Sequence, residues 1–423
     1  MPSGLGLSTI LAQAPSFDTG NTGFMLLATS LVMLMTPGLA FFYGGLVGRK
    51  HTLTIMMQSF VSLGWTTILW FICGYSLCFS GDVGGVIGDL HAAFLHGITL
   101  QTVFGTGSNA PIPLYVFVSY QMMFAIITPA LITGAFANRV RFSAYLIFLT
   151  LWLLLVYFPF VHMVWGGGML QQWGVRDFAG GIVVHNTAGF AALASVFFVG
   201  RRRTTDPGLH SVPLVALGTG LLWFGWYGFN AGSELQVDAV TCQAFLNTDV
   251  AASFAAIVWM LLAWVLERKP KFVGLLTGAV AGLATITPAA GFVTVSSAAI
   301  IGIVAGVVCY FAVALKNKLH WDDALDVWGV HGVGGLLGTV CVGLFGSLAV
   351  NEYVGANGLF AGGGATLLFK QLVAVVGSSI YALVFTLVML WIINFITPVR
   401  VSDVEEQTGL DASLHGETAY EMQ

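Results

Sequence analysis

Two histidines in apolar stretches are the side chains with the most evident chemical use. His185 lies in the segment GGIVVHNTAGF and His331 lies in DVWGVHGVGG. A neutral imidazole donates a hydrogen bond through one nitrogen and accepts one through the other, and its unperturbed pKa is about 6.5. An ionisable side chain within a membrane-spanning helix is costly and faces a cavity or the bundle interior. Both histidines are therefore candidates for a functional role inside the membrane.

An aspartate precedes each histidine by eight residues, at Asp177 and Asp323. Eight helical residues span about 12 Å, so each histidine is expected well inside the bilayer. Asp177 is expected either to cap its helix or to give a negative field to an outer vestibule. Asp326 is expected in the first turns of the helix that carries His331, with an N-terminal structural role. Two other interpretations of the histidines stay open, a structural hydrogen bond and a heme or metal pair.

Composition places these residues in a membrane protein. Hydrophobic residues make up 57% of the 423 residues and charged residues 8%, whereas soluble domains carry roughly 25% charged residues. So few charges cannot coat a water-exposed surface, and lipid is the expected environment. The net charge of −4 gives no indication of a nucleic-acid partner. We expect a multi-pass protein of the cell membrane, that is, the inner or plasma membrane.

Apolar runs of about 20 residues, the length that crosses a bilayer, predict an all-α membrane protein with eleven transmembrane helices. The eighth run is short and ends at Thr287-Pro288. Residues 1–21 are expected to form an extracytoplasmic lead-in, 22–397 the eleven-helix membrane domain and 398–423 a cytoplasmic tail. The predicted spans are 22–47, 53–79, 113–137, 142–161, 178–199, 211–233, 247–267, 272–288, 295–315, 324–349 and 366–397.

Basic residues give an independent test of this count. Thirteen of the fifteen Lys and Arg residues follow odd-numbered spans, and only Arg176 and Lys370 do not. The positive-inside rule then predicts the N-terminus outside and the C-terminus inside. Five helices per half force opposite orientations, so about 22–200 and about 211–350 are expected to form an inverted five-plus-five repeat, followed by a final helix at about 366–397. The acidic tail is expected to be either disordered or docked on the inner loops.

Aromatic residues cluster near the expected outer ends of the helices. Such a cluster is either an ordinary interfacial belt or a cage that attracts a cation to its ring faces, with a hydroxyl as hydrogen-bond acceptor. The residues are Tyr120 and Phe124, four apart on one helical face, Trp165 in HMVWGGG, and Trp226 and Phe229 in GWYGFNAGS, which ends at Ser233.

Seven motifs together resemble the ammonium transporter family (Amt/Mep/Rh), and Trp165 and Ser233 resemble its Amt/Mep branch in the bacterial type. The resemblance covers nearly the whole chain. The motifs are PGLAFFYGGLVG (37–48), ITGAFANRVRFSAYLIF (132–148), HMVWGGG (162–168), DFAGGIVVH (177–185), GWYGFNAGS (225–233), DVWGVHGVGG (326–335) and EEQTGLDASLHGETAY in the tail.

The resemblance implies a transporter rather than an enzyme, assembled as a homotrimer with one pore per protomer and without a cofactor or metal. Its substrates would be ammonium and methylammonium. Ammonium would be recruited at an outer site, lose its proton and cross as ammonia, with or without a relayed proton. The tail implies a P-II-type (GlnK-like) signal protein as a partner at the cytoplasmic face. Two other functions stay open, an ammonium sensor that acts through a partner and a heme-binding membrane redox protein.

The resemblance also assigns roles to residues of this chain. The chain departs from the family pattern at Tyr120 and Trp328, where phenylalanine is expected, and these changes bear on fine selectivity. The implied roles are recruitment by Trp165, Ser233, Tyr120 and Phe124, a gate of Phe124 and Phe229, a pore and proton relay of His185 and His331, and supporting positions at Asp177, Asp326, Trp226 and Gln121.

Overall fold

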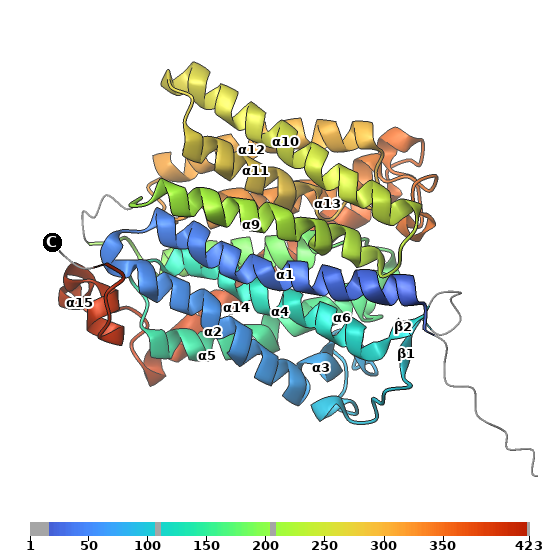
Figure 1. Cartoon of the computed structure of the whole chain (residues 1–423), viewed down its shortest axis with the longest axis horizontal. Helices are drawn as coiled ribbons and strands as arrows, with labels where there is room; N and C mark the ends of the chain where they lie inside the picture. The colour runs from blue at the N-terminus through green and yellow to red at the C-terminus, as the bar shows by residue number, and fades with distance from the viewer. Residues whose placement is uncertain (1–16, 106–110, 204–208, 421–423) are drawn as a thin grey trace, which may run out of the picture.

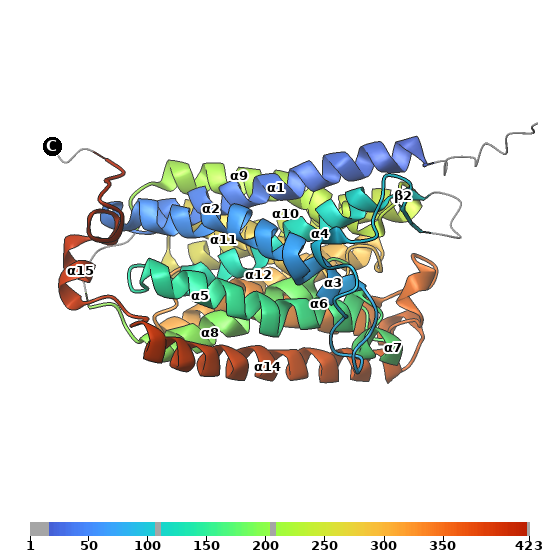
Figure 2. The same ribbon diagram turned by 90° about the horizontal axis from the view of Figure 1, so that it is seen from below.

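The computed structural model describes residues 17–105, 111–203 and 209–420. These residues form a bundle of long helices that run roughly along one axis (Figure 1). The short helix α15 (Asp403–Thr408) lies at one end of the bundle. The strands β1 (Val103–Phe104) and β2 (Ile112–Pro113) lie at the opposite end (Figure 2). We call these the tail end and the loop end.

Ten helical segments in the described part of the chain are long and apolar enough to cross a membrane. A further apolar helix of 15 residues, α11 (Phe272–Ile286), occupies the place of the predicted eighth span. The protein is therefore a mainly helical, multi-pass membrane protein with about ten to eleven spanning helices. The ten segments are α1 (Thr19–Leu46), the run from η1 to α3 (Arg49–Phe79), α4 (Leu114–Phe136), the run from α5 to α7 (Phe142–Trp173), η5 with α8 (Gly181–Val199), α9 with η6 (Val212–Glu234), α10 (Ala239–Glu267), α12 (Val295–Lys318), η7 with α13 (Trp328–Phe345) and α14 (Thr366–Ile396).

Short π-helical and 3-10 turns interrupt or join these segments. A π-turn carries an extra residue in the helix and often marks a functional position. The π-helical segments are η2 (Trp70–Gly74), η4 (Leu153–Tyr157), η5 (Gly181–Asn186), η7 (Trp328–Gly332) and η10 (Asp411–His415). The 3-10 turns are η1 (Arg49–His51), η3 (Ala93–Leu95), η6 (Gly232–Glu234), η8 (Glu352–Val354) and η9 (Leu359–Ala361). The remaining helices are α2 (Thr52–Leu69), α3 (Tyr75–Phe79), α5 (Phe142–Trp152), α6 (Phe158–Trp165), α7 (Met169–Trp173), α8 (Thr187–Val199), α9 (Val212–Ala231) and α13 (Val333–Phe345).

Among the helix starts, that of α10 differs most from its predicted span, because the helix begins at Ala239 and the predicted span begins at 247. Asp238 and Thr241 form a capping box, in which the Asp238 carboxylate accepts the Thr241 N–H at 3.0 Å. Asn247 is fully buried within the helix and donates to the carbonyl of Ala290 at 2.8 Å. Polar residues with internal partners therefore extend the helix beyond its apolar run.

Candidate functional site

The two histidines meet in the bundle interior, each on a π-helical segment. His185 lies in η5 and His331 in η7, and their exposed fractions are 1% and 4%. Their Nδ1 atoms are 3.2 Å apart, and their rings stack with centroids 5.2 Å apart and an interplanar angle of 22°. The structure thus brings together the two residues that the sequence singled out from segments 146 positions apart.

The direct contact between the rings restricts their protonation. A hydrogen bond between two Nδ1 atoms requires one to carry a proton and the other to present a lone pair. Nε2 of His185 is buried and has no hydrogen-bond partner among the described residues. This atom is therefore free to bind a small molecule that donates or accepts a hydrogen bond.

The contact between the rings is too short for the two opposing axial ligands of one heme iron. A metal-bound imidazole nitrogen lies about 2.0–2.1 Å from the metal, so two opposing ligands are about 4 Å apart. The Nδ1 atoms are closer than that, at 3.2 Å. The described residues also contain no group of three or more His, Cys, Asp or Glu side chains that could hold a metal ion. The two Nδ1 atoms therefore do not act as the two axial ligands of one heme iron.

Buried aspartates hold the start of both π-helical segments. The two carboxylate oxygens of Asp177 accept hydrogen bonds from the N–H groups of residues 180–183 at 2.7 to 3.2 Å. These are donors that a helix N-terminus leaves without partners. Asp323 Oδ2 accepts the N–H of Trp328 at 2.8 Å, at the start of η7. The aspartate eight residues before each histidine therefore has the same local task.

Asp326 differs from its expected position in the first turns of the helix. It precedes η7 with a left-handed backbone (φ 60°) and pairs with Lys316 at 2.7 Å. Lys316 also donates to the carbonyl of Asp323 at 2.6 Å. Burial raises the pKa of Asp323 to about 6, although the charge of Lys316 opposes this rise. The residue that contacts the helix start is Asp323, whereas the sequence predicted this N-terminal role for Asp326.

The backbones that carry the histidines cross in direct contact. A Cβ atom added at Gly189 would lie 2.1 Å from the Cα of Gly332, the neighbour of His331. Real Cβ atoms do not approach that closely. Any side chain at position 189 would therefore push the two segments apart.

A cavity of about 370 Å³ opens on the loop-end side of the histidines, and we call it the aromatic cavity. Trp165 Nε1 donates to the carbonyl of Asp177 at 2.8 Å, which fixes the indole at the cavity wall. Ser233 Oγ donates to the carbonyl of Phe229 at 2.9 Å, so its remaining lone pairs are available as acceptors. The aromatic cavity is lined by Phe79, Phe104, Phe117, Gln121, Phe124, Trp165, Gln171, Asp177, Phe178, Ser233, Glu234, Leu235, Phe292 and Tyr353.

Tyr120 is not among the residues that line the aromatic cavity, although the sequence assigned it to substrate binding. Its side chain is fully buried. Its hydroxyl lies 2.9 Å from the carbonyl of Phe229 and 3.2 Å from Ser233 Oγ. The hydroxyl that distinguishes this residue from phenylalanine therefore contacts Ser233 and helps to fix its side chain.

Two phenylalanine rings in tilted contact close the path between the aromatic cavity and the histidines. Phe124 and Phe229 are 1% exposed, and their ring centroids are 4.3 Å apart. Phe229 lies 6.0 Å from the ring of His185, and Trp226 lies 5.4 Å from it. Trp226 Nε1 donates to Thr287 Oγ1 at 2.9 Å, which fixes its indole. The aromatic series is continuous from the cavity to the imidazoles.

A second cavity, of about 290 Å³, begins on the other side of the histidines, and we call it the tail-side cavity. His331, Val330 and Asp326 form part of its wall, together with Tyr43 of α1 and Arg202. The two cavities thus approach the stacked rings from opposite sides, with the imidazole pair and the phenylalanine pair between them.

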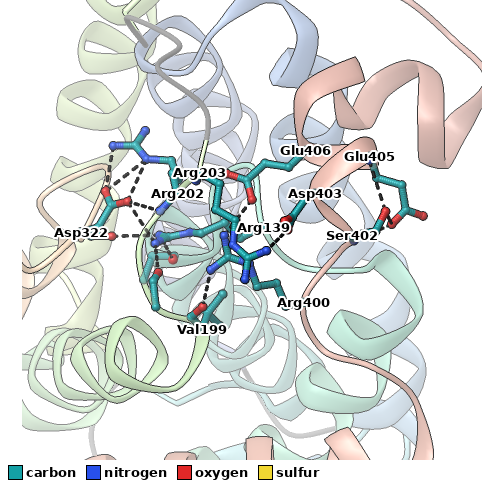
Figure 3. A network of polar contacts seen from close by, with 12 residues as sticks. Arg139, Val199, Arg202, Arg203, Asp322, Arg400, Ser402, Asp403, Glu405 and Glu406 are labelled. Carbon is teal, nitrogen blue, oxygen red and sulfur yellow. Dashed lines mark hydrogen bonds and ion pairs between the residues drawn. The ribbon is translucent and has the colours of Figure 1, made fainter.

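The C-terminal tail is docked at the tail end, which settles one alternative left open by the sequence. The buried Glu406 accepts the N–H of Arg203 at 2.6 Å, and the Arg203 guanidinium pairs with Asp403 (Figure 3). The carboxylate of Asp411 accepts the N–H groups of residues 53–54 at the start of α2, at 3.0 and 2.8 Å. Sequence analysis left docking undecided, although basic loops beside an acidic tail were a usable signal.

Comparisons with known proteins agree with this architecture. The family model described as Ammonium Transporter Family matches residues 23–420. The ammonium transporter of Bacillus subtilis (strain 168) is 45% identical over 404 residues, which cover 95% of this chain and 98% of that protein.

Two solved structures are also similar. The crystal structure of Candida albicans Mep2 gives a TM-score of 0.84 at 36% identity, covering 92% of this chain and 88% of that one. A structure described as a sensor Amt protein gives a TM-score of 0.84 at 28% identity, covering 94% and 98%. The family match extends over nearly every described residue, including both histidines and both cavities. The chain belongs to the ammonium transporter family.

Proposed function

We propose that the protein moves ammonium across the cell membrane through the path from the aromatic cavity to the tail-side cavity. Ammonium and methylammonium bind in the aromatic cavity and give up a proton to Nε2 of His185 as they pass the Phe124 and Phe229 rings. The neutral amine then passes along His185 and His331. The observation that carries this proposal is the pair of cavities on opposite sides of a closed, ring-lined stretch that contains two imidazoles.

Selection against potassium follows from the chemistry of this path. Both cations gain about 0.5–2 kcal/mol from an aromatic face. Only ammonium donates hydrogen bonds, for which Ser233 Oγ presents lone pairs. Only ammonium gives up a proton, and desolvation behind the phenylalanine rings favours that loss by destabilising the charged form. A potassium ion that entered the same stretch would keep its charge and its full desolvation cost.

The histidines handle the proton or the neutral amine. One Nδ1 donates to the other, so a proton delivered to one ring is passed by exchanging the two tautomers. The unpartnered Nε2 of His185 offers a first contact to the molecule that leaves the phenylalanine rings. Whether a proton accompanies each ammonia depends on this exchange, and the net transported charge measures it.

Orientation and assembly are part of the proposal. The positive-inside rule places the tail end in the cytoplasm and the aromatic cavity outside. The matching Asp-to-His spacing at Asp177 and Asp323 supports an inverted repeat. Family membership supports a homotrimer and a P-II-type partner that binds the face formed by the docked tail.

A second candidate function is ammonium sensing, because of the likeness to the sensor Amt structure. In that case ammonium would occupy the same aromatic cavity, and a partner would detect its occupancy. Transport measurements discriminate between the two functions, since a sensor needs binding and not flux.

The experiment is current measurement on a solid-supported membrane that carries proteoliposomes. Pulses of ammonium or methylammonium are expected to give transient currents or a change in internal pH, and pulses of potassium neither. Liposomes without protein are the control. If neither substrate produces a signal above this control in either readout, the transport proposal is wrong.

A further inference from the structure

Glu234 places a carboxylate in the wall of the aromatic cavity, directly after Ser233. It ends the 3-10 turn η6, and its side chain is partly buried. The next residue, Leu235, has a left-handed backbone (φ 62°) and closes the turn by donating to the carbonyl of Gly232 at 2.9 Å. Glu234 lies just beyond the motif GWYGFNAGS, and neither motif nor spacing in the sequence indicates a role for it.

A neighbouring loop holds one carboxylate oxygen of Glu234 in place. Asn351 Nδ2 donates to Glu234 Oε2 at 3.1 Å. The other end of the same amide, Oδ1, accepts the N–H of Tyr353 at 2.9 Å, which determines which way the amide faces. Gln236 also hydrogen-bonds to the Glu234 side chain. A carboxylate has about four acceptor positions, so these two contacts leave acceptor capacity towards the cavity.

The other carboxylate at this cavity lacks such capacity. Asp177 already accepts four backbone N–H groups through its two oxygens. Glu234, in contrast, forms no ion pair with a lysine or arginine within the described ranges. The remaining polar side chains of the wall, including Gln121, Gln171 and Ser233, are neutral. Glu234 is therefore the carboxylate that can meet an incoming cation directly.

We propose that Glu234 is a cation-binding residue of the aromatic cavity, which accepts a hydrogen bond from ammonium or methylammonium before the phenylalanine rings. This inference rests on the proposed function and names one more residue of the same site. A charge-assisted hydrogen bond is roughly twice as strong as a neutral one. Glu234 raises the affinity for both substrates, and the exclusion of potassium stays with the rings and histidines beyond it.

The matched control is Asp238, four residues further along the chain. Its Oδ1 caps α10 by accepting the Thr241 N–H at 3.0 Å, and its Oδ2 accepts from Gln236 at 2.8 Å. Asp238 is not among the residues that line the cavity. Asp238→Asn removes the same charge close by and keeps an amide that caps helices well. This variant therefore measures how much a nearby negative charge affects the cation when the carboxylate does not touch it.

The test compares Glu234→Gln, Glu234→Asp and Asp238→Asn with the parent protein in proteoliposomes. For Glu234→Gln we expect the ammonium concentration at half-maximal signal to rise about tenfold, with the maximal signal within about twofold. Glu234→Asp keeps the charge, and its half-maximal concentration is expected to lie between those of the parent protein and Glu234→Gln. Asp238→Asn is expected to change the half-maximal concentration by less than about twofold.

Methylammonium binding to detergent-purified protein, measured by titration calorimetry, provides a readout that does not depend on transport. Glu234→Gln is expected to weaken this binding about tenfold as well. An affinity of Glu234→Gln equal to that of the parent protein or of Asp238→Asn overturns the inference. If the parent protein binds methylammonium but carries no flux, the transport proposal fails, and the binding comparison still decides the role of Glu234.

Discussion

At the loop end, the buried carboxylate of Asp177 is satisfied by four backbone N–H groups. At the tail end, the buried carboxylate of Glu406 contacts the backbone N–H of Arg203 at 2.6 Å and the guanidinium of Arg400 at 2.8 Å. Fixed backbone dipoles stabilise a charge without adding a counter-ion that competes with a passing cation. Pairs of charged side chains attach a segment that can also be released.

The difference shows how one helix bundle serves two tasks. The path itself contains rings, imidazoles and backbone dipoles, so a cation that enters it meets little competition and a high desolvation cost. The tail end concentrates arginines, including the fully buried Arg139, whose guanidinium donates to the carbonyls of Gly200, Ala135 and Asp322 at 2.5 to 2.9 Å. Changes in the path should therefore affect conduction strongly, and changes at the tail end should affect docking with weaker effects on conduction.

The largest effect is expected for the histidines. His185→Asn and His331→Gln keep a polar side chain that makes one hydrogen bond, but an amide does not titrate near neutral pH. We expect ammonium currents below about a tenth of the parent protein's, or a gain of potassium conduction. Size-exclusion chromatography must first show that each variant is folded and assembled like the parent protein. If both single variants give currents like the parent protein's and still exclude potassium, the histidine pair has only a structural role.

The second effect concerns the two phenylalanine rings. Phe124→Ala combined with Phe229→Ala removes the pair whose centroids are 4.3 Å apart and joins the aromatic cavity to the imidazoles. Water and hydrated ions should then reach His185, so potassium is expected to conduct or ammonium transport to fall. Potassium and ammonium currents recorded on the same proteoliposomes check this result. Unchanged transport and unchanged exclusion would remove the gate from the mechanism.

A smaller effect is expected for the docked tail. Glu406→Gln keeps the side-chain shape but removes the charge that pairs with Arg400, at a cost of about 1–3 kcal/mol to docking. Hydrogen exchange of residues 403–415 is expected to speed up by about tenfold or more, while ammonium currents change little. Val404→Ala, at a position 73% exposed, is the control. Equal exchange rates in the two variants would show that the charge does not hold the tail.

The smallest effect is expected from pH. Hydrogen bonds from Ser402 lower the pKa of Glu405, which also pairs with Arg141. Carboxylates with lowered pKa values stabilise docking above their ordinary pKa and lose that effect only as pH falls through the lowered values.

Tail protection in hydrogen exchange, corrected for intrinsic rates, is therefore expected to stay constant from about pH 8 to about pH 5. It should decline only below about pH 4, the ordinary range of these acids. Loss of protection already near neutral pH would show that another group controls docking.

Sequence reasoning reached the helices and the histidines because both depend on strong, local energetic rules. Apolar runs of about 20 residues are the length that crosses a bilayer. An ionisable histidine inside such a run is energetically costly, which marks it as a functional candidate. The contact between His185 and His331 could not be read from the sequence, since it depends on π-turns that leave no hydrophobic pattern. Asp323 was passed over for Asp326, because a left-handed residue outside the helix cannot be told from its first turn.

Placement around the aromatic cavity was predicted only in part. Phe124, Trp165 and Ser233 do line it, together with Gln121. Tyr120 lies four residues before Phe124 on the same helix. Its hydroxyl nevertheless donates to the backbone carbonyls of Gly228 and Phe229, and its side chain does not line the cavity. Such a difference depends on tertiary hydrogen bonds, which neither spacing nor composition reveals.

The glycine crossing at Gly189 and Gly332 bears on how the protein responds to its bilayer. Thin or thick membranes tilt helices and change the lateral pressure on them, and loosely packed channels convert this tilt into opening or closing. Here the main chains of the two segments that carry the imidazoles are in direct contact at Gly189 and Gly332. No side chain lies between them there that could repack when the helices tilt. The spacing of the rings is thus set by van der Waals contact between two main chains. Transport per molecule should then depend little on lipid chain length or membrane tension, in contrast to a mechanosensitive pore.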